Sequence, residues 1–106
     1  MMNESEFHII ADEALSRMFE VLEHADAAGD IEVEYQDGVM TIEMEDGRQF
    51  IVSKHTPSRQ LWLSSPVSGG FHFGHDAADW KLGDGRTLAG ILSAELRALA
   101  KIEVTF

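Results

Sequence analysis

Apolar residues recur at three- and four-residue steps near both ends of the chain. This spacing places them on one face of a helix. It predicts an N-terminal helix over residues 4–27, in which Asn3 and Glu6 form a capping box at the first turn. It also predicts a C-terminal helix that begins after Thr87 and includes one charged residue, Glu95, on its apolar face.

Between these helices, apolar and polar residues alternate over short stretches, which is the pattern of strands with one buried face. Asp-Gly pairs at positions 37–38, 46–47 and 84–85 are typical of tight turns. The predicted strands span residues 30–35, 40–44, 49–54, 60–64, 70–73 and 80–82.

Short turns join antiparallel neighbours, and two amphipathic helices each need an apolar surface to cover. We therefore predict an α+β fold, a two-layer sandwich in which an antiparallel sheet of about six strands carries the N- and C-terminal helices on one face. The other face is expected to be open to water. The tail over residues 102–106 is expected to cover the space between the helices. Residues 1–106 contain no repeat or linker and are expected to form a single domain.

Acidic residues are concentrated in the first half of the chain. Residues 1–46 contain 14 Asp and Glu and one base, Arg17, whereas residues 47–106 contain five acids and seven bases. The whole chain has a net charge of −11. Such a protein is repelled by nucleic acids and by anionic membrane surfaces, so neither is an expected partner.

Several classes of protein are excluded by what the sequence lacks. The absence of cysteine rules out disulfides, thiolate catalysis and cysteine-ligated metals. The chain has no P-loop, no dinucleotide-binding fingerprint and no Gly-x-Ser-x-Gly motif, so we do not expect an enzyme. The polar, acidic first residues and the lack of an apolar run of about 20 residues predict a cytoplasmic bacterial protein.

The end of the first helix and the first strand bring carboxylates to one edge of the predicted fold. They are Glu20, Glu23, Asp26, Asp30, Glu32 and Glu34. Oxygen ligands suit hard cations such as Mg²⁺, Ca²⁺, Mn²⁺ and iron, although no EF-hand loop is present to form a tight site. A solvated acidic face is the simpler interpretation. The self-repulsion of so many acids favours a function instead, either weak cation binding, docking to a basic protein surface, or both.

Two histidines lie one helical turn from a carboxylate on the first helix. His8 precedes Asp12 by four residues, and Glu20 precedes His24 by four, so each pair is able to share one metal ion. The alternative is that both are ordinary surface histidines.

The open sheet face carries an aromatic side chain. Alternation points Leu61 and Leu63 to the core and Trp62 outward, together with Gln60 and Ser64. An exposed strand tryptophan is a candidate anchor for a protein partner. The alternative is a tryptophan that only covers neighbouring strands. Trp80 is predicted to lie in the core.

These features, taken in order along the chain, resemble the frataxin family, specifically its bacterial CyaY type. The resemblance rests on residues 5–8, 30–34, 37–42, 57–63, 69–73 and 79–88. Its most specific parts are a Pro-x-x-Gln-x-Trp-Leu stretch and the Gly-Gly-aromatic-His-Phe stretch that follows it. The resemblance covers essentially the whole chain.

The resemblance implies an iron-binding regulator of iron–sulfur cluster assembly that is a monomer without metal. It implies weak binding of Fe²⁺ and Fe³⁺, for which other divalent cations substitute. It also implies docking on a cysteine desulfurase and contact with the iron–sulfur scaffold protein, and delivery of iron is a further role that it suggests. The implied metal ligands are Glu4, Asp12, Glu20, Glu23, Asp26, Asp30, Glu32 and Glu34, to which we add His8 and His24. The implied partner-binding residues are Glu20, Glu23, Ser53, Lys54, Gln60 and Trp62.

Two other functions remain open. The acidic surface is also compatible with an iron-independent protein-interaction module. An iron-storage or ferroxidase protein is the third interpretation, and it is disfavoured because the chain lacks the paired Glu-x-x-His motifs of di-iron centres. Within the resemblance, His24 stands where an acid is common and Ser53 stands where an asparagine is frequent.

Overall fold

The structure is a computed structural model that describes residues 2–25, 31–76 and 79–106. Along the chain it contains α1 (Glu4–Ala25), β1 (Ile31–Gln36), β2 (Val39–Met44), β3 (Gln49–His55), β4 (Gln60–Ser65), β5 (Gly69–Asp76), β6 (Asp79–Lys81) and α2 (Leu88–Ala100). A single turn of 3₁₀ helix, η1 (Thr56–Ser58), joins β3 to β4.

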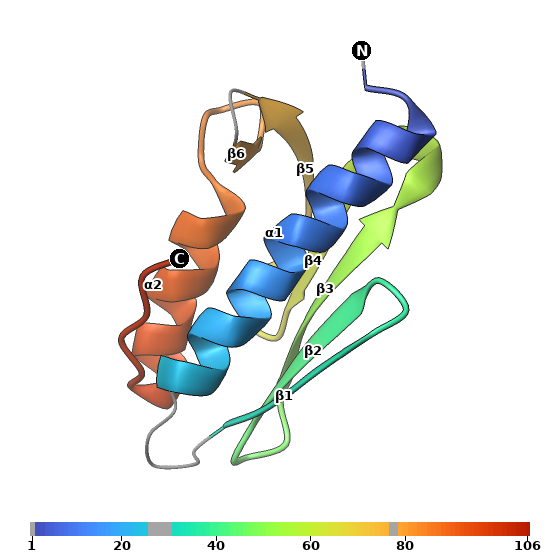
Figure 1. Ribbon diagram of the computed structural model, residues 1–106. Coiled ribbons are helices and arrows are strands. Elements are labelled where there is room, and N and C mark those ends of the chain that lie inside the picture. Colours follow the sequence, from blue (N-terminus) through green and yellow to red (C-terminus); the bar gives the residue numbers. More distant parts are fainter. Residues whose placement is uncertain (1, 26–30, 77–78) are drawn as a thin grey trace.

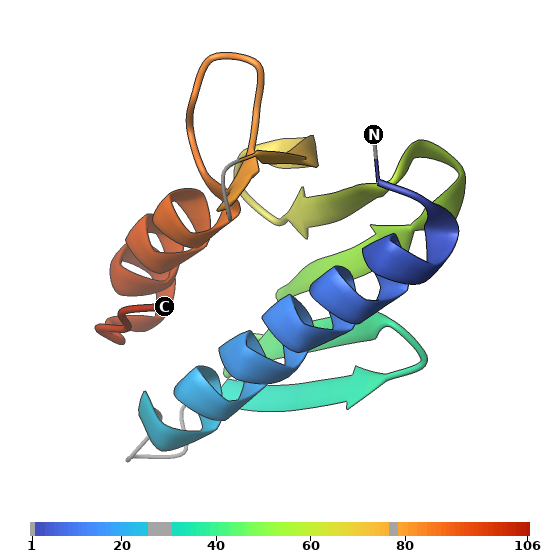
Figure 2. The same ribbon diagram turned by 45° about the horizontal axis from the view of Figure 1, so that its top comes forward.

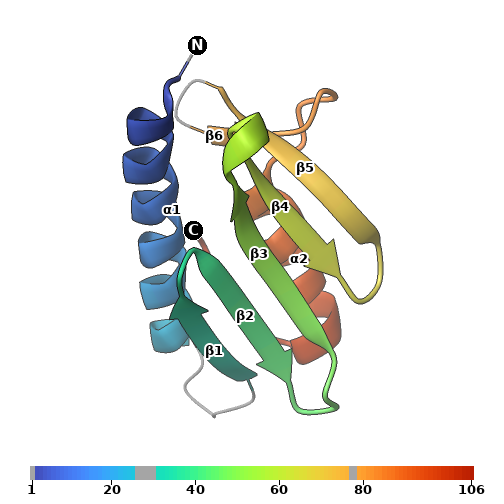
Figure 3. The same ribbon diagram turned by 90° about the vertical axis from the view of Figure 1, so that its right-hand side faces the viewer.

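The strands form one antiparallel sheet in which each strand pairs with the next one along the chain, in the order β1 to β6. Figures 1 and 2 show both helices on the same side of this sheet, with α1 beside β1 and α2 toward β6. Figure 3 shows the strands from the side on which the sheet is uncovered. The predicted two-layer α+β sandwich is confirmed.

The core lies between the sheet and the helices and is built from the residues that the sequence pattern predicts to face inward. Its fully buried large side chains are Phe7, Leu15, Leu22, Met40, Ile42, Phe50, Leu61, Leu63, Phe73, Leu88, Leu92 and Leu96. Trp80 is buried as predicted. Removal of this apolar surface from water is the main force that holds the two layers together.

Both helices begin at their predicted caps. The backbone N–H of Glu6 donates to Asn3 Oδ1 at 2.8 Å, and the backbone N–H of Asn3 donates to Glu6 Oε1 at 3.4 Å, which completes the capping box. At α2, the backbone N–H of Gly90 donates to Thr87 Oγ1 at 3.0 Å. The predicted end of the first helix, at residues 26–27, lies outside the described residues.

The C-terminal tail and Glu95 both have structural roles. Ile102 is buried, and Val104 and Phe106 pack against the core, as predicted for the tail. Glu95 accepts hydrogen bonds from the hydroxyl groups of Ser65 and Ser68, at 2.5 and 2.6 Å. These bonds tie α2 to the turn between β4 and β5, which explains a charged residue on an otherwise apolar helix face.

Two features differ from the sequence prediction. β5 continues to Asp76, three residues beyond its predicted end, because it gains β6 as a pairing partner beyond Phe73. The η1 turn at Pro57 was not predicted. Among the described residues, no helix is long and apolar enough to cross a membrane.

Candidate functional site

One side of α1 runs along the edge strand β1, where the rings of Phe19 and Tyr35 lie 6.4 Å apart. Glu20 lies on another side of the helix, beside Glu103 and Val104 of the C-terminal tail. Asp26 and Asp30, which were predicted to continue the acidic edge, lie outside the described residues. The remaining predicted ligands separate into two groups with different surroundings.

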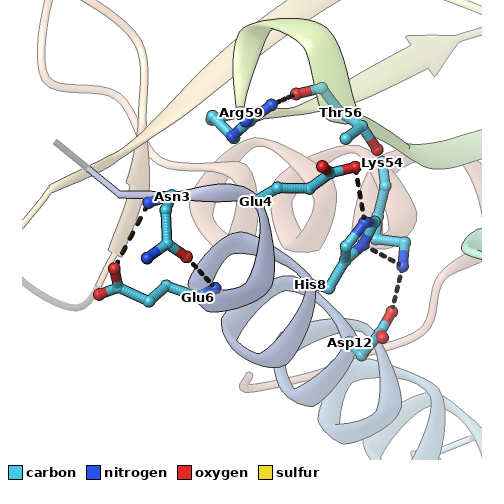
Figure 4. A network of polar contacts seen from close by, with 8 residues as sticks. All are labelled: Asn3, Glu4, Glu6, His8, Asp12, Lys54, Thr56 and Arg59. Atoms are coloured by element: carbon cyan, nitrogen blue, oxygen red, sulfur yellow. Dashed lines mark hydrogen bonds and ion pairs between the residues drawn. The ribbon is translucent and has the colours of Figure 1, made fainter.

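The first group lies at the N-terminal half of α1 and surrounds a lysine (Figure 4). The Lys54 ammonium group lies 2.7 Å from Asp12 Oδ1 and 3.1 Å from His8 Nδ1. His8 Nε2 lies 3.8 Å from a carboxylate oxygen of Glu4. We call Glu4, His8, Asp12 and Lys54 the paired end.

The position of Lys54 follows from strand alternation. Phe50 and Val52 point into the core from β3, and Lys54 continues on the same face toward α1. Its side chain is only 16% exposed, and it passes over Gly38 in the turn between β1 and β2. Gly38 has a φ of +77°, and a Cβ atom there would lie 2.6 Å from Lys54 Cε, so another residue would strain the turn and displace the lysine side chain.

Tyr35 belongs to the same network. Its hydroxyl donates to Asp12 Oδ1 at 3.2 Å. Burial, followed by the charge of the Asp12 carboxylate, raises the pKa of the Tyr35 phenol above its ordinary value.

The paired end bears on two expectations about placement. Glu4, His8 and Asp12 were predicted as metal ligands, and the Lys54 ammonium occupies the space between His8 and Asp12. Lys54 was predicted near Trp62 on the open face, but it lies on the helix-covered face, because its position in β3 has the same parity as Val52. A metal ion that binds here has to displace the ammonium group.

The second group has no such cation. Glu20, Glu23, Glu32 and Glu34 are exposed, and within the described ranges no basic side chain comes within ion-pair distance of them. Glu23 follows Asp12 by eleven residues, close to three full helical turns, and therefore lies on the same side of α1 as Asp12.

His24 is less available than the sequence suggested. Its ring atom Nδ1 lies 2.8 Å from the backbone oxygen of Glu20. This contact occupies one ring nitrogen with the helix backbone, so only Nε2 remains to share a metal ion with a carboxylate.

The sheet adds a carboxylate that the sequence analysis did not include. In the register of β1 and β2, Glu32 lies directly opposite Glu43. The two-residue turn at Asp37 and Gly38, both with positive φ, sets this register and would have allowed its prediction. We call Glu20, Glu23, Glu32, Glu34 and Glu43 the unpaired acids.

The described residues contain no group of three or more His, Asp or Glu side chains arranged to hold a metal ion. The unpaired acids therefore offer a band of oxygen atoms and not a preformed cage. Such an arrangement suits weak, hydrated binding of hard cations.

The open sheet face confirms the outward orientation of Trp62. Its ring stacks between His55 of β3 and His72 of β5, at centroid distances of 3.8 and 4.0 Å and with interplanar angles of 12°. Ser53 lies opposite Trp62 in the β3–β4 register, and Gln60 accepts a hydrogen bond from the indole Nε1–H at 3.0 Å. Trp62 is therefore half-buried by its strand neighbours.

Comparisons with known proteins agree with this geometry. A family model described as a frataxin-like domain matches residues 1–102. The chain is 42% identical over 79 residues to the iron–sulfur cluster assembly protein CyaY of Vibrio cholerae, covering 74% of this chain and 73% of that protein.

Solved structures give the same result. A frataxin from Psychromonas ingrahamii superposes with a TM-score of 0.88 and 27% identity, over 98% of this chain and 97% of that one. A trimeric frataxin from the yeast Saccharomyces cerevisiae, complexed with ferrous iron, superposes with a TM-score of 0.76 and 33% identity, over 84% and 83% of the two chains. The chain described here belongs to the frataxin family and to its bacterial CyaY group.

Proposed function

We propose that this protein acts in iron–sulfur cluster assembly as a non-enzymatic, iron-binding regulator. The observation that carries the proposal is the set of unpaired acids on α1, β1 and β2, four of them exposed and Glu43 partly buried, for which no described basic side chain lies within ion-pair distance. The assembly role named for the Vibrio cholerae relative and the ferrous iron bound by the yeast frataxin both support it.

Iron binds first at the unpaired acids. Carboxylate oxygens are suitable ligands for Fe²⁺ and Fe³⁺, and exposed, mutually repelling side chains bind them weakly and with several waters retained. At the paired end, binding has to compete with the Lys54 ammonium, which is already 2.7 Å from Asp12. Glu4, His8 and Asp12 are therefore ligands of lower affinity in this proposal.

The same edge docks on the cysteine desulfurase. A band of negative charge attracts a basic surface over several ångströms and accelerates encounter. Iron bound to Glu20 and Glu23 neutralises part of this charge and weakens the contact. One surface that serves both iron and the desulfurase thus makes the interaction sensitive to iron.

The scaffold protein is contacted by the open sheet face. Trp62 and Gln60 lie on β4, and Ser53 lies opposite Trp62 on β3. A large, partly exposed aromatic side chain surrounded by polar groups is typical of an interface anchor.

A charge reversal tests the docking surface. We expect Glu20→Lys/Glu23→Lys to weaken binding to the cognate desulfurase at least tenfold at moderate salt, measured by calorimetry. The matched control is Asp76→Lys/Asp79→Lys, which makes the same change in net charge on β5 and β6, at the opposite edge of the sheet. Equal losses in both variants would show that net charge and not the acidic edge decides binding.

The rate of sulfide production tests the regulatory role. We expect this protein to change the rate at which the desulfurase, in the presence of its scaffold, produces sulfide. The size of the change should depend on the Fe²⁺ concentration. A response that ignores iron would favour the iron-independent interaction module. Oxidation of Fe²⁺ by O₂ faster than in buffer, with formation of large assemblies, would favour the storage or ferroxidase alternative.

A further inference from the structure

Three aromatic rings form a continuous stack across the open sheet face. They are His55 on β3, Trp62 on β4 and His72 on β5, three strands that lie next to each other in Figure 3. Both interplanar angles are 12°, so the three rings are nearly parallel. We call these residues the ring stack. Because an imidazole covers each face of the indole, the stack presents ring edges to a partner.

Hydrogen bonds hold the stack in place. The indole Nε1–H donates to Gln60 Oε1 at 3.0 Å, and the Ser58 hydroxyl donates to the same oxygen at 2.9 Å. Ser58 Oγ also lies 2.6 Å from His55 Nδ1. Since this hydroxyl uses its proton toward Gln60, it accepts from Nδ1–H, which places the proton of a neutral His55 on Nδ1.

These bonds decide which groups remain for a partner. The side-chain oxygen of Gln60 accepts two hydrogen bonds, while its amide nitrogen donates none within the described part of the chain. The Gln60 amide group is therefore free to donate. In neutral His55 the remaining nitrogen, Nε2, is an acceptor, and protonation converts it to a donor. Aromatic ring edges carry positive partial charge, so they also favour an electron-rich partner such as a hydrogen-bond acceptor.

The stack also lies in the acid-free part of the chain. Residues 47–75 contain no Asp or Glu, although the chain has 19 acids in all. The unpaired acids on the same sheet lie on β1 and β2, beyond β3. An anionic partner segment is therefore repelled by the acidic edge and not by the ring stack.

We propose that the ring stack and Gln60 form a preorganised donor surface that docks a partner segment bearing carboxylates, with His55 and His72 as its positioning residues. Its partner chemistry is the opposite of that of the unpaired acids, which attract basic groups. The inference refines the scaffold contact proposed above and rests on it only for the identity of the partner.

The proposal implies that docking strengthens when His55 and His72 are protonated. The added protons place positive charge beside the indole and a cation–π contact on each of its faces. The charged groups on the elements that flank the ring stack are Asp37 of the β1–β2 turn, Glu43 of β2, Arg59 after η1, Asp76 of β5, and Asp79 and Lys81 of β6. Of these, Glu43 and the aspartates oppose docking of a carboxylate.

Peptide probes test the chemistry without any assumption about the partner. We expect hexaglutamate to shift the NMR resonances of the Trp62 indole N–H and the Gln60 side-chain amide, several-fold more at pH 6 than at pH 8. Hexalysine should instead shift residues around the unpaired acids. If hexaglutamate leaves Trp62 and Gln60 unmoved at both pH values, the donor surface is wrong.

Two double variants separate stacking from protonation. His55→Phe/His72→Phe keeps aromatic rings on both faces of the indole but cannot take up a proton, so we expect the response to hexaglutamate to lose its pH dependence. His55→Ala/His72→Ala removes both properties and should reduce the response at least tenfold at pH 6. A response of the alanine variant equal to that of the unmodified protein would overturn the positioning role.

A histidine elsewhere supplies the matched control. His75 lies against Trp80 on the helix-covered face, at a ring distance of 5.0 Å, so His75→Ala removes a histidine without touching the stack. We expect it to respond as the unmodified protein does. Binding of the cognate scaffold is then measured with the same variants. If hexaglutamate behaves as expected but the scaffold does not bind, the donor surface is supported and the scaffold contact is refuted.

Discussion

The two ends of the acidic edge contain the same kinds of side chain in different electrostatic surroundings. At the paired end, Asp12 faces an ammonium group at 2.7 Å and accepts a hydrogen bond from Tyr35. At the other end, Glu32 faces Glu43 across the strand pair, and no described cation is within ion-pair distance. The first arrangement stabilises the fold, whereas the second costs stability through repulsion.

The difference indicates that a carboxylate on this edge is available to a metal ion only where the fold leaves it without a cation of its own. Lys54 accounts for this difference, because its position on β3 places its ammonium group beside Asp12, in the N-terminal half of α1, and away from the C-terminal end of that helix. An acidic sequence is therefore a poor guide to which of its acids bind metal.

The largest expected effect comes from removing that cation. Lys54→Met keeps the aliphatic stem over Gly38 but deletes the charge. We expect a loss of about 1–2 kcal/mol in the free energy of unfolding, because Asp12 and His8 lose their partner. In urea titrations, the control Arg17→Met should lose less than about 0.5 kcal/mol, since the Arg17–Glu13 pair is exposed on both sides.

The same variant tests metal selectivity along the edge. With Mn²⁺ as a paramagnetic probe, we expect line broadening around the unpaired acids in the unmodified protein. In Lys54→Met the broadening should extend to His8 and Asp12. Equal broadening at both ends before substitution would show that Lys54 does not compete with metal.

A smaller effect is expected at alkaline pH. The raised pKa of Tyr35 means that the unfolded chain ionises first, near pH 10, so the contribution of Tyr35 to stability is present below that pH and is lost as the pH rises through its folded-state value. Tyr35→Phe should flatten the loss of stability above pH 10, at a cost of about 1 kcal/mol at neutral pH from the missing hydrogen bond to Asp12.

Absorbance reads this ionisation directly, because Tyr35 is the single tyrosine of the chain. Its phenolate band should appear at a higher pH in the folded protein than in urea. An identical midpoint in both states would contradict a role of burial and Asp12 in holding the proton.

The smallest expected effect is a gain. Glu32→Gln removes a like charge directly opposite Glu43 and should stabilise the fold by about 0.2–1 kcal/mol at low salt, less as salt is added. Glu34→Gln is the matched control, since Glu34 lies opposite Thr41 and is expected to gain less. Thermal unfolding at two salt concentrations compares the stability of the two variants. Equal gains in stability would indicate a general effect of net charge and not the Glu32–Glu43 pair.

Several features that the sequence analysis missed were nonetheless encoded locally. The parity of Phe50 and Val52 along β3 places Lys54 on the helix side, and the Asp37–Gly38 turn sets Glu43 opposite Glu32. Both follow from period-two alternation and a two-residue turn. The ring stack is different, because it depends on two strand registers joined by η1 and by the turn after β4, whose geometry no local pattern specifies.

By itself, the sequence determined the two helices, their caps, most strand positions and the acidic character of one edge, because periodicity, capping residues and Asp-Gly turns act over a few residues. Only the tertiary structure decided which acids have a cation, where Lys54 points and which rings cover Trp62. These properties depend on contacts between residues far apart in the chain. Asp12 and Lys54 illustrate this, since they are 42 positions apart in the sequence while 2.7 Å separates their charged atoms.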